Sequence, residues 1–166
     1  GEAFDKGARI LGLGYPGGPE IEKLSKTGDE TSINFPRPLM KNKNLEFSFS
    51  GLKTSLLYFV ENKKSFSKQD VAASYQAAII DVLITKLKWA MDKTDCKTCV
   101  IAGGVASNQI LRKLANKTMK NKKVIFPELS LCTDNAAMIA YLGEIYLQKG
   151  IYSPIDFSIL PNMKLV

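Results

Sequence analysis

The last third of the sequence alternates between strand-like and helix-like segments, and this alternation constrains the fold more than any other feature. An apolar run over 98–102 leads through two glycines into a helical pattern over 107–119, and a second apolar run over 124–126 precedes another helical pattern over 134–148. Strands separated by helices of this length pair in parallel through right-handed crossovers. A two-stranded parallel sheet makes a poor core, so we expect this segment to end a larger α/β unit whose earlier strands lie outside the chain.

The first two thirds are mainly helical in pattern. Apolar residues at helical spacing over 2–13 stop at a pair of glycines, and longer patterns cover 52–61 and 68–91. Between them, apolar residues alternate with polar ones over 33–50, which indicates two short strands with prolines that confine the first to a sheet edge. The sequence therefore predicts a hairpin over 33–50, a helical segment over 51–93 and an α/β segment over 97–149.

Histidine is absent from all 166 residues. This absence removes Ser-His-Asp chemistry, Cys-His chemistry and every His-ligated metal site that the chain could build alone. Cys96 and Cys99 form a single CxxC pair, and Cys132 stands apart. A structural zinc site would need a second pair, and free cysteine is commonly a small core residue, so we assign no metal or redox role to the three thiols.

The chain is basic, with 23 Lys and Arg residues against 16 Asp and Glu residues and a net charge of +7. A basic balance favours a polyanionic partner such as nucleic acid, although scattered lysines also serve only to solvate a surface. No apolar stretch approaches the roughly 18 to 20 residues that cross a bilayer. The first residues lack the pattern of a signal peptide, so we expect a cytoplasmic location and no membrane partner.

A glycine turn lies between the first strand and the helix that follows it. Gly103 and Gly104 lack Cβ atoms, so a ligand can approach their backbone, and the following helix N-terminus offers unpaired N–H groups. Open α/β sheets bind nucleotides at this place. The alternative is a tight strand-to-helix turn with Ser107 or Asn108 as the helix cap.

Two acidic motifs leave similar alternatives. Thr133 or Asp134 can cap the last helix, or the Asp134 carboxylate can hold a metal or ligand at a strand-end cleft. Asp5, on the first helix, precedes a loop that contains Gly17 and Gly18. That pair is either part of a binding site or an exposed acid followed by an ordinary turn.

Six motifs cover nearly the whole chain up to about residue 150; they are GEAFDK at 1–6, GYPGGP at 14–19, FPRP at 35–38, FSFSGLKT at 47–54, AGGVASN at 102–108 and CTDNAAMIA at 132–140. With these motifs in this order, the sequence resembles the carboxyl-terminal half of the TsaD family of tRNA threonylcarbamoyladenosine transferases. Older annotation called this family O-sialoglycoprotein endopeptidases or glycoproteases.

The resemblance implies a fold and a set of ligand contacts. The fold is the two-lobed fold of sugar kinases, Hsp70 and actin, of which residues 1–166 would supply mainly the second lobe with a helical and hairpin insertion. Asp5 and Gly18 would contact the ribose or the threonylcarbamoyl part of the substrate adenylate. Glu22 lies where several members carry an acidic ribose contact, and Asn108 would bind the nucleotide beside Gly103 and Gly104. Asp134 matches the single carboxylate ligand of the family's catalytic metal, iron or zinc.

The implied reaction moves threonylcarbamoyl from threonylcarbamoyl-adenylate to N6 of adenosine 37 in tRNAs that read codons starting with A. AMP is a good leaving group, so the chemistry depends on alignment and polarisation and needs no protein nucleophile. In bacteria the implied partners are accessory proteins for this modification, a paralogous dimerisation subunit and a P-loop ATPase.

Two family motifs do not occur in the chain. The HxxxH motif supplies the other metal ligands, and the SGGH motif supplies a glycine-rich substrate loop. We therefore expect a fragment of a longer enzyme, inactive alone, with half of the nucleotide site and one metal ligand. Two alternatives remain, a metalloendopeptidase as in the older family name and a nucleotide-binding module without catalysis.

Overall fold

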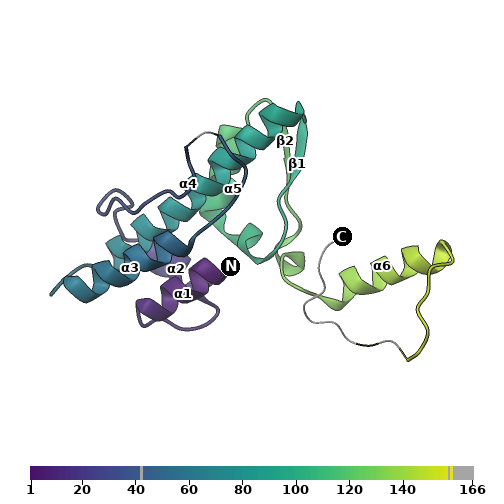
Figure 1. Ribbon diagram of the computed structural model, residues 1–166, viewed down its shortest axis with the longest axis horizontal. Helices are drawn as coiled ribbons and strands as arrows, with labels where there is room; N and C mark the ends of the chain where they lie inside the picture. Colours follow the sequence, from purple (N-terminus) through teal and green to yellow (C-terminus); the bar gives the residue numbers. More distant parts are fainter. Residues whose placement is uncertain (42, 157, 159–166) are drawn as a thin grey trace. The chain divides into compact units, whose positions relative to one another are not determined.

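The computed structural model describes residues 1–41, 43–156 and 158, and the chain divides into two compact units, Gly1–Cys132 and the residues from Thr133 onward (Figure 1). In chain order the elements are α1 (Glu2–Ile10), α2 (Gly17–Ser25), α3 (Ser50–Asn62), α4 (Lys68–Thr94), β1 (Thr98–Val100), the 3-10 turn η1 (Gly104–Ser107), α5 (Gln109–Thr118), β2 (Lys123–Ile125), the 3-10 turn η2 (Leu129–Leu131) and α6 (Ala136–Gln148).

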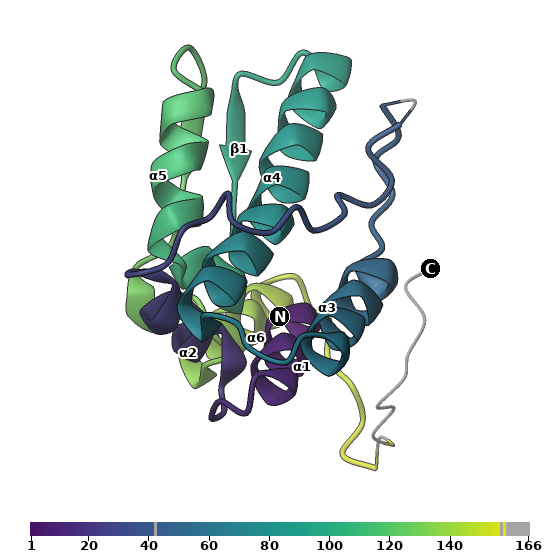
Figure 2. The ribbon, with the colours of Figure 1, turned by 90° about the vertical axis from the view of Figure 1, so that its left-hand side faces the viewer.

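Helix α4 is the central helix of the first unit, and both apolar clusters of that unit include its residues. Its start is fixed by Ser67, whose Oγ accepts a hydrogen bond from the backbone N–H of Asp70 at 3.2 Å, and it ends at Asp95 in the left-handed conformation. Figure 2 shows β1 and α5 beside one half of α4 and helices α1, α2 and α3 near the other. A single long helix therefore joins the helical part of the unit to its small sheet.

Two apolar clusters pack against helix α4. The first joins α1, α2 and α3 to the amino-terminal half of α4, with Phe4, Ile21, Leu52 and Tyr75 among its buried residues. The second joins the middle of α4 to α5 and one face of the sheet; its buried members are Ile80, Ile84, Leu111 and Ala115. Burial of these side chains is the main source of stability for the unit.

The expected parallel pairing of two strands is confirmed. β1 and β2 pair in parallel, with Thr98 opposite Lys123 and Val100 opposite Ile125. The connection between them runs through η1 and α5, as a parallel crossover requires. The described chain is thus a mixed α/β structure with a two-stranded sheet.

The hairpin predicted over 33–50 is wrong, since the described residues between Ile33 and Phe49 form no strand. Pro36 and Pro38 lack the N–H that a ladder needs, and Leu39 adopts a φ of 54°. Side chains of α4 hold the segment instead. Asp81 accepts from Arg37 Nη2 at 2.9 Å, and the buried Lys86 donates to the backbone carbonyls of residues 44 and 46.

The second unit contains α6. Asn135 caps this helix, because its Oδ1 accepts from the backbone N–H of Met138 at 3.0 Å. The expectation that Thr133 or Asp134 is the cap is therefore wrong by one residue or two, a shift that sequence pattern alone does not resolve. Among the helices that the structure describes, none combines the length and apolarity needed to cross a bilayer.

Candidate functional site

Asn108 lies at the start of α5 and is almost completely buried, with 5% of its surface exposed. Its Oδ1 accepts from the backbone N–H of Leu111 at 2.9 Å, and its Nδ2 donates to Gln76 Oε1 at 2.7 Å. Asn108 is therefore the helix cap that the sequence offered as one alternative. The amide keeps a second N–H and a second lone pair, so capping does not exhaust its hydrogen-bonding capacity.

The turn before this cap is open. Gly103 has a φ of +87°, which disfavours any side chain, and no atom lies within 4 Å of the position that a Cβ would take. Gly104 begins η1, and its carbonyl accepts from Ser107 Oγ at 2.6 Å. The backbone at Gly103 and Gly104 is exposed, so a ligand can approach it closely.

Glu22 reaches this same place from α2. Its Oε1 accepts from the backbone N–H of Gln109 at 2.7 Å, a contact between residues 87 positions apart. The carboxylate therefore occupies one of the unpaired N–H groups at the start of α5. A second anion at that N–H would meet like charge, whereas a hydroxyl could donate to the remaining carboxylate oxygen.

Asp5 fixes the other end of α2. Its Oδ1 accepts from the backbone N–H of Gly17 at 2.8 Å, which satisfies a donor in the first turn of α2, where the cap residue Pro16 has no side chain to do so. A Cβ on Gly17 would lie 2.6 Å from the Cα of Asp5, so α1 and α2 meet at this glycine. Gly18 beside it has open space within 4 Å.

Helix α2 thus carries contacts to both parts of the expected site. At its start it meets Asp5, and near its middle Glu22 reaches the cap of α5. The structure directly joins Glu22 to the segment that contains Asn108, and it places Asp5 against the residue before Gly18. Asp5 and Asn108 are not joined by a hydrogen bond in the described residues.

Asp134 belongs to the second unit and is exposed, immediately before the cap residue of α6. Within residues 1–41, 43–156 and 158, no group of three or more His, Cys, Asp or Glu side chains could hold a metal ion. The residues present therefore do not form a metal site by themselves, and Asp134 offers one ligand at most.

The cysteines are all free. Burial raises the pKa of the Cys99 thiol, so Cys99 resists the ionisation that metal binding or redox exchange requires. Cys132 is buried, and its Sγ lies 3.3 Å from Arg112 Nη2. The environments of Cys99 and Cys132 agree with structural thiols, whereas Cys96 is exposed.

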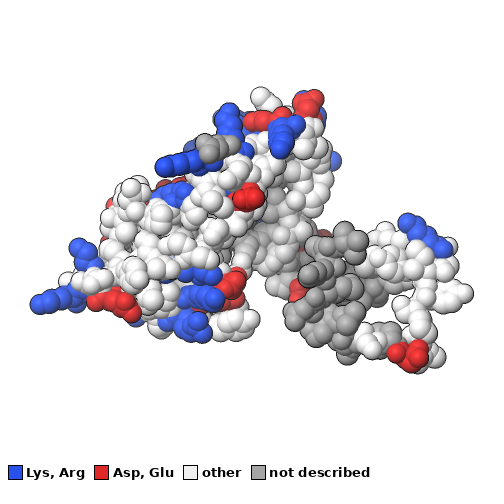
Figure 3. Space-filling view, in the orientation of Figure 1, with Lys and Arg blue, Asp and Glu red and all other residues white. Residues whose placement is uncertain are grey.

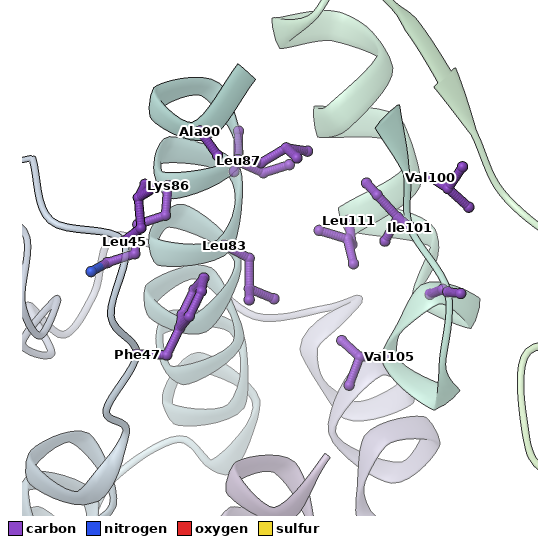
Figure 4. Close-up of a pocket in the computed structure, with 13 residues that line it drawn as sticks. Leu45, Phe47, Leu83, Lys86, Leu87, Ala90, Val100, Ile101, Val105 and Leu111 are labelled. Atoms are coloured by element: carbon purple, nitrogen blue, oxygen red, sulfur yellow. The ribbon is translucent and has the colours of Figure 1, made fainter. Parts of the chain in front are cut away.

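Two further features are a cavity, which reaches Ala102 and Val105 on either side of the Gly103–Gly104 turn, and the charged surface of the first unit. A cavity of about 400 Å³ lies between α4, β1 and residues 45–47, and Figure 4 shows Leu83 and Leu87 extending from α4 toward Ile101 and Leu111. Its lining is almost entirely apolar and includes none of the expected ligand residues. Figure 3 shows basic and acidic side chains mixed on the visible face of the first unit. That face resembles a solvated surface more than a basic patch.

Sequence reasoning missed Gln76. This residue is 4% exposed on α4 and joins two elements of the site, since its Nε2 donates to Ser25 Oγ at 2.8 Å and its Oε1 accepts from Asn108. A glutamine inside the apolar stretch 71–80 was the available signal, because buried polar groups need partners.

Comparison with known proteins yields one family. The family model described as TsaD, tRNA N6-adenosine threonylcarbamoyltransferase, matches residues 1–141. Relatives that carry this same name are 54% identical in Thermosipho africanus, 49% in Kosmotoga olearia and 46% in Thermotoga neapolitana. Each alignment covers 99% or 100% of this chain and 51% of the relative. The chain therefore spans about half the length of the curated relatives it matches.

Proposed function

This chain belongs to the TsaD family, and from that membership we propose that it forms the carboxyl-terminal part of a tRNA N6-adenosine threonylcarbamoyltransferase. The observation that carries the proposal is the family match over residues 1–141. We also propose that the complete protein has the two-lobed fold of sugar kinases, Hsp70 and actin, with this chain mainly in the second lobe. The parallel strand pair and its crossover helix support that assignment.

The proposed substrate is threonylcarbamoyl-adenylate, and its ribose is recognised beside α2. The structure gives Glu22 one hydrogen bond among the described residues, through Oε1, which leaves Oε2 to accept from a ribose hydroxyl. Asp5 uses Oδ1 for Gly17 in the same way, and Gly18 offers open backbone beside it. Two carboxylates suit hydroxyl groups, which donate, better than phosphate oxygens, which do not.

The nucleotide is proposed to contact Asn108 at the turn formed by Gly103 and Gly104. The open backbone at Gly103 and the remaining amide N–H of Asn108 support this contact. In the reaction, N6 of the tRNA adenosine forms a bond to the threonylcarbamoyl carbonyl carbon, and the bond to the AMP phosphate oxygen breaks. The part of these residues is to hold the adenylate so that its carbonyl is aligned with the amine.

A divalent metal, iron or zinc, is proposed for the complete protein with Asp134 as one ligand. The described residues do not complete such a site, so its other ligands would come from outside this chain. Further proposed partners are tRNA and accessory proteins of the same modification, which in bacteria include a paralogous dimerisation subunit and a P-loop ATPase. A tRNA substrate supports a cytoplasmic location.

Complementation tests the proposed function in cells. The complete polypeptide that contains this chain is expressed in bacteria depleted of their own transferase, and their tRNA is digested and analysed by mass spectrometry. We expect the threonylcarbamoyl-adenosine nucleoside to return. Well-expressed polypeptide with unmodified tRNA would contradict the proposal, and cleavage of a glycoprotein by the same purified polypeptide would favour the endopeptidase alternative.

A further inference from the structure

A buried relay of polar side chains connects α2, α4 and α5 behind the proposed adenylate site. Ser25 Oγ donates to the carbonyl of Glu22 at 2.9 Å and accepts from Gln76 Nε2 at 2.8 Å. Gln76 Oε1 then accepts from Asn108 Nδ2 at 2.7 Å, and Asn108 Oδ1 accepts from Leu111 N at 2.9 Å. The relay therefore begins at one proposed ligand residue and ends at the other.

The direction of every bond in this relay follows from one backbone group. The N–H of Leu111 is a donor, so the Asn108 atom that faces it must be the carbonyl oxygen, and the NH2 group must face Gln76. Gln76 must then present its own oxygen to Asn108 and its NH2 group to Ser25. Ser25 is left to donate to Glu22, so no side-chain amide in the relay can be flipped without loss of a bond.

We infer that Gln76 is a positioning residue for adenylate binding, an inference that rests on the proposed function. Gln76 acts through Asn108 and not on the ligand. Its Oε1 accepts from one N–H of the Asn108 amide, whose other N–H is the proposed ligand contact, and its Nε2 connects that amide through Ser25 to the helix turn that carries Glu22. Because Gln76 is 4% exposed and both its polar ends are paired, a substitution that removes its oxygen leaves the Asn108 NH2 group buried without that partner. The Asn108 amide would then no longer be held in the orientation that presents its second N–H to the ligand.

A double-mutant cycle on the complete protein tests this inference. The affinity of a non-hydrolysable analogue of threonylcarbamoyl-adenylate is measured by titration calorimetry for the wild type, Gln76→Met, Asn108→Ala and the double variant. We expect Gln76→Met to weaken binding by about 5- to 150-fold in the wild-type background, because the bound state must restore an orientation of the Asn108 amide that a buried hydrogen bond no longer holds. In the Asn108→Ala background we expect less than about a twofold further loss, because the residue through which Gln76 acts is gone.

Two variants separate positioning from general destabilisation. Val82→Ala removes buried side-chain atoms from the same helix without touching the relay, and we expect its affinity to stay within about twofold of the wild type. Gln76→Glu keeps an oxygen for Asn108, but Ser25 can donate to the new carboxylate only by giving up its bond to the Glu22 carbonyl, so we expect a loss that is smaller than in Gln76→Met. If Gln76→Met does not fold, Gln76→Glu takes its place in the cycle, and its loss should likewise disappear in the Asn108→Ala background.

Three results would overturn the inference. These are wild-type affinity in Gln76→Met, the same factor of loss from the Gln76 substitution in both backgrounds, and a loss in Val82→Ala as large as that in Asn108→Ala. Failure of the wild-type protein itself to bind the analogue would instead contradict the proposed function, so the two failures can be told apart.

Discussion

Gly17 and Gly18 are adjacent residues with opposite surroundings. Substitutions at these two positions can therefore distinguish a residue that the fold requires from one that is open to a ligand. A Cβ on Gly17 would lie 2.7 Å from the carbonyl oxygen of Phe4 and 2.8 Å from the Cβ of Ala8, while a Cβ on Gly18 would meet nothing within 4 Å. Backbone atoms cannot move aside as the end of a long side chain can. Gly17 is therefore required for the packing of α1 on α2, and Gly18 is free to serve a ligand.

We predict that Gly17→Ala lowers the free energy of unfolding by about 1–3 kcal/mol or more, the cost of overpacking. Gly18→Ala should leave it unchanged or raise it by up to about 1 kcal/mol, because alanine favours a helix over glycine. Urea unfolding of both variants measures these changes. Calorimetry on Gly18→Ala in the complete protein should show weaker binding of an adenylate analogue despite the intact fold; unchanged affinity would remove Gly18 from the proposed site.

Burial of Tyr75 links stability to pH. Its hydroxyl donates to the Ala3 carbonyl at 2.9 Å, and burial raises its pKa well above the usual value. The folded-state pKa of Tyr75 lies above the unfolded value of about 10. The contribution of the neutral Tyr75 side chain to the free energy of unfolding is therefore complete below pH 10 and is lost as pH rises beyond it.

We therefore predict that the stability difference between the wild type and Tyr75→Phe is constant up to about pH 9 and shrinks above pH 10. Denaturant unfolding at a series of pH values measures this difference. Tyr58→Phe, which changes an exposed tyrosine on α3, is the matched control and should show no such trend. A Tyr75→Phe difference that grows with pH would contradict the assignment.

At the scale of elements, the sequence predicts those helices, strands and turns whose conformation is determined by residues close by in the chain. The strand, glycine turn and helix over 98–119 follow from local periodicity, and the parallel pairing follows from the crossover between β1 and β2. The segment over 33–49 was mispredicted because its conformation depends on Lys86, which lies 40 and 42 positions from its partners Glu46 and Asn44. A period-two pattern is no guide to a contact at that separation.

The same distinction applies to the candidate site. The family resemblance implied roles for Glu22 and Asn108, but only the folded chain joins Glu22 to Gln109 across 87 positions. Gln76 was missed because its role depends on where Ser25 and Asn108 lie, and neither is its neighbour in sequence.

We predict that Lys86→Met loosens the irregular segment. Lys86 is 1% exposed, and its Nζ donates to Asn44 Oδ1 at 2.9 Å and lies 5.3 Å from the centre of the Phe47 ring. Loss of these contacts should lower the free energy of unfolding by about 1–3 kcal/mol and speed amide hydrogen exchange over 44–49. Lys88→Met, an exposed lysine on the same helix, should change neither. Unaltered exchange in Lys86→Met would contradict the account of this segment.

At the scale of the whole molecule, the chain carries the residues proposed to bind the adenylate and does not complete the proposed site. Glu22 and Asn108 are joined across the first unit, and Asp5 is fixed at the start of α2. The described residues form no three-ligand metal group, and the chain spans about half of its curated relatives. Alignment of an amine with a carbonyl requires both substrates to be held at once. We therefore expect the residues of this chain to contribute to substrate binding without carrying out the transfer by themselves.

The most direct test is a transfer assay on two purified proteins, this chain alone and the complete polypeptide that contains it. Each is incubated with tRNA, threonylcarbamoyl-adenylate, metal and the accessory proteins, and the digested RNA is analysed by mass spectrometry for threonylcarbamoyl-adenosine. We predict product from the complete polypeptide and none from the chain alone. Robust product from the chain alone would contradict the claim that its site is incomplete, and no product from either protein would contradict the proposed transferase activity.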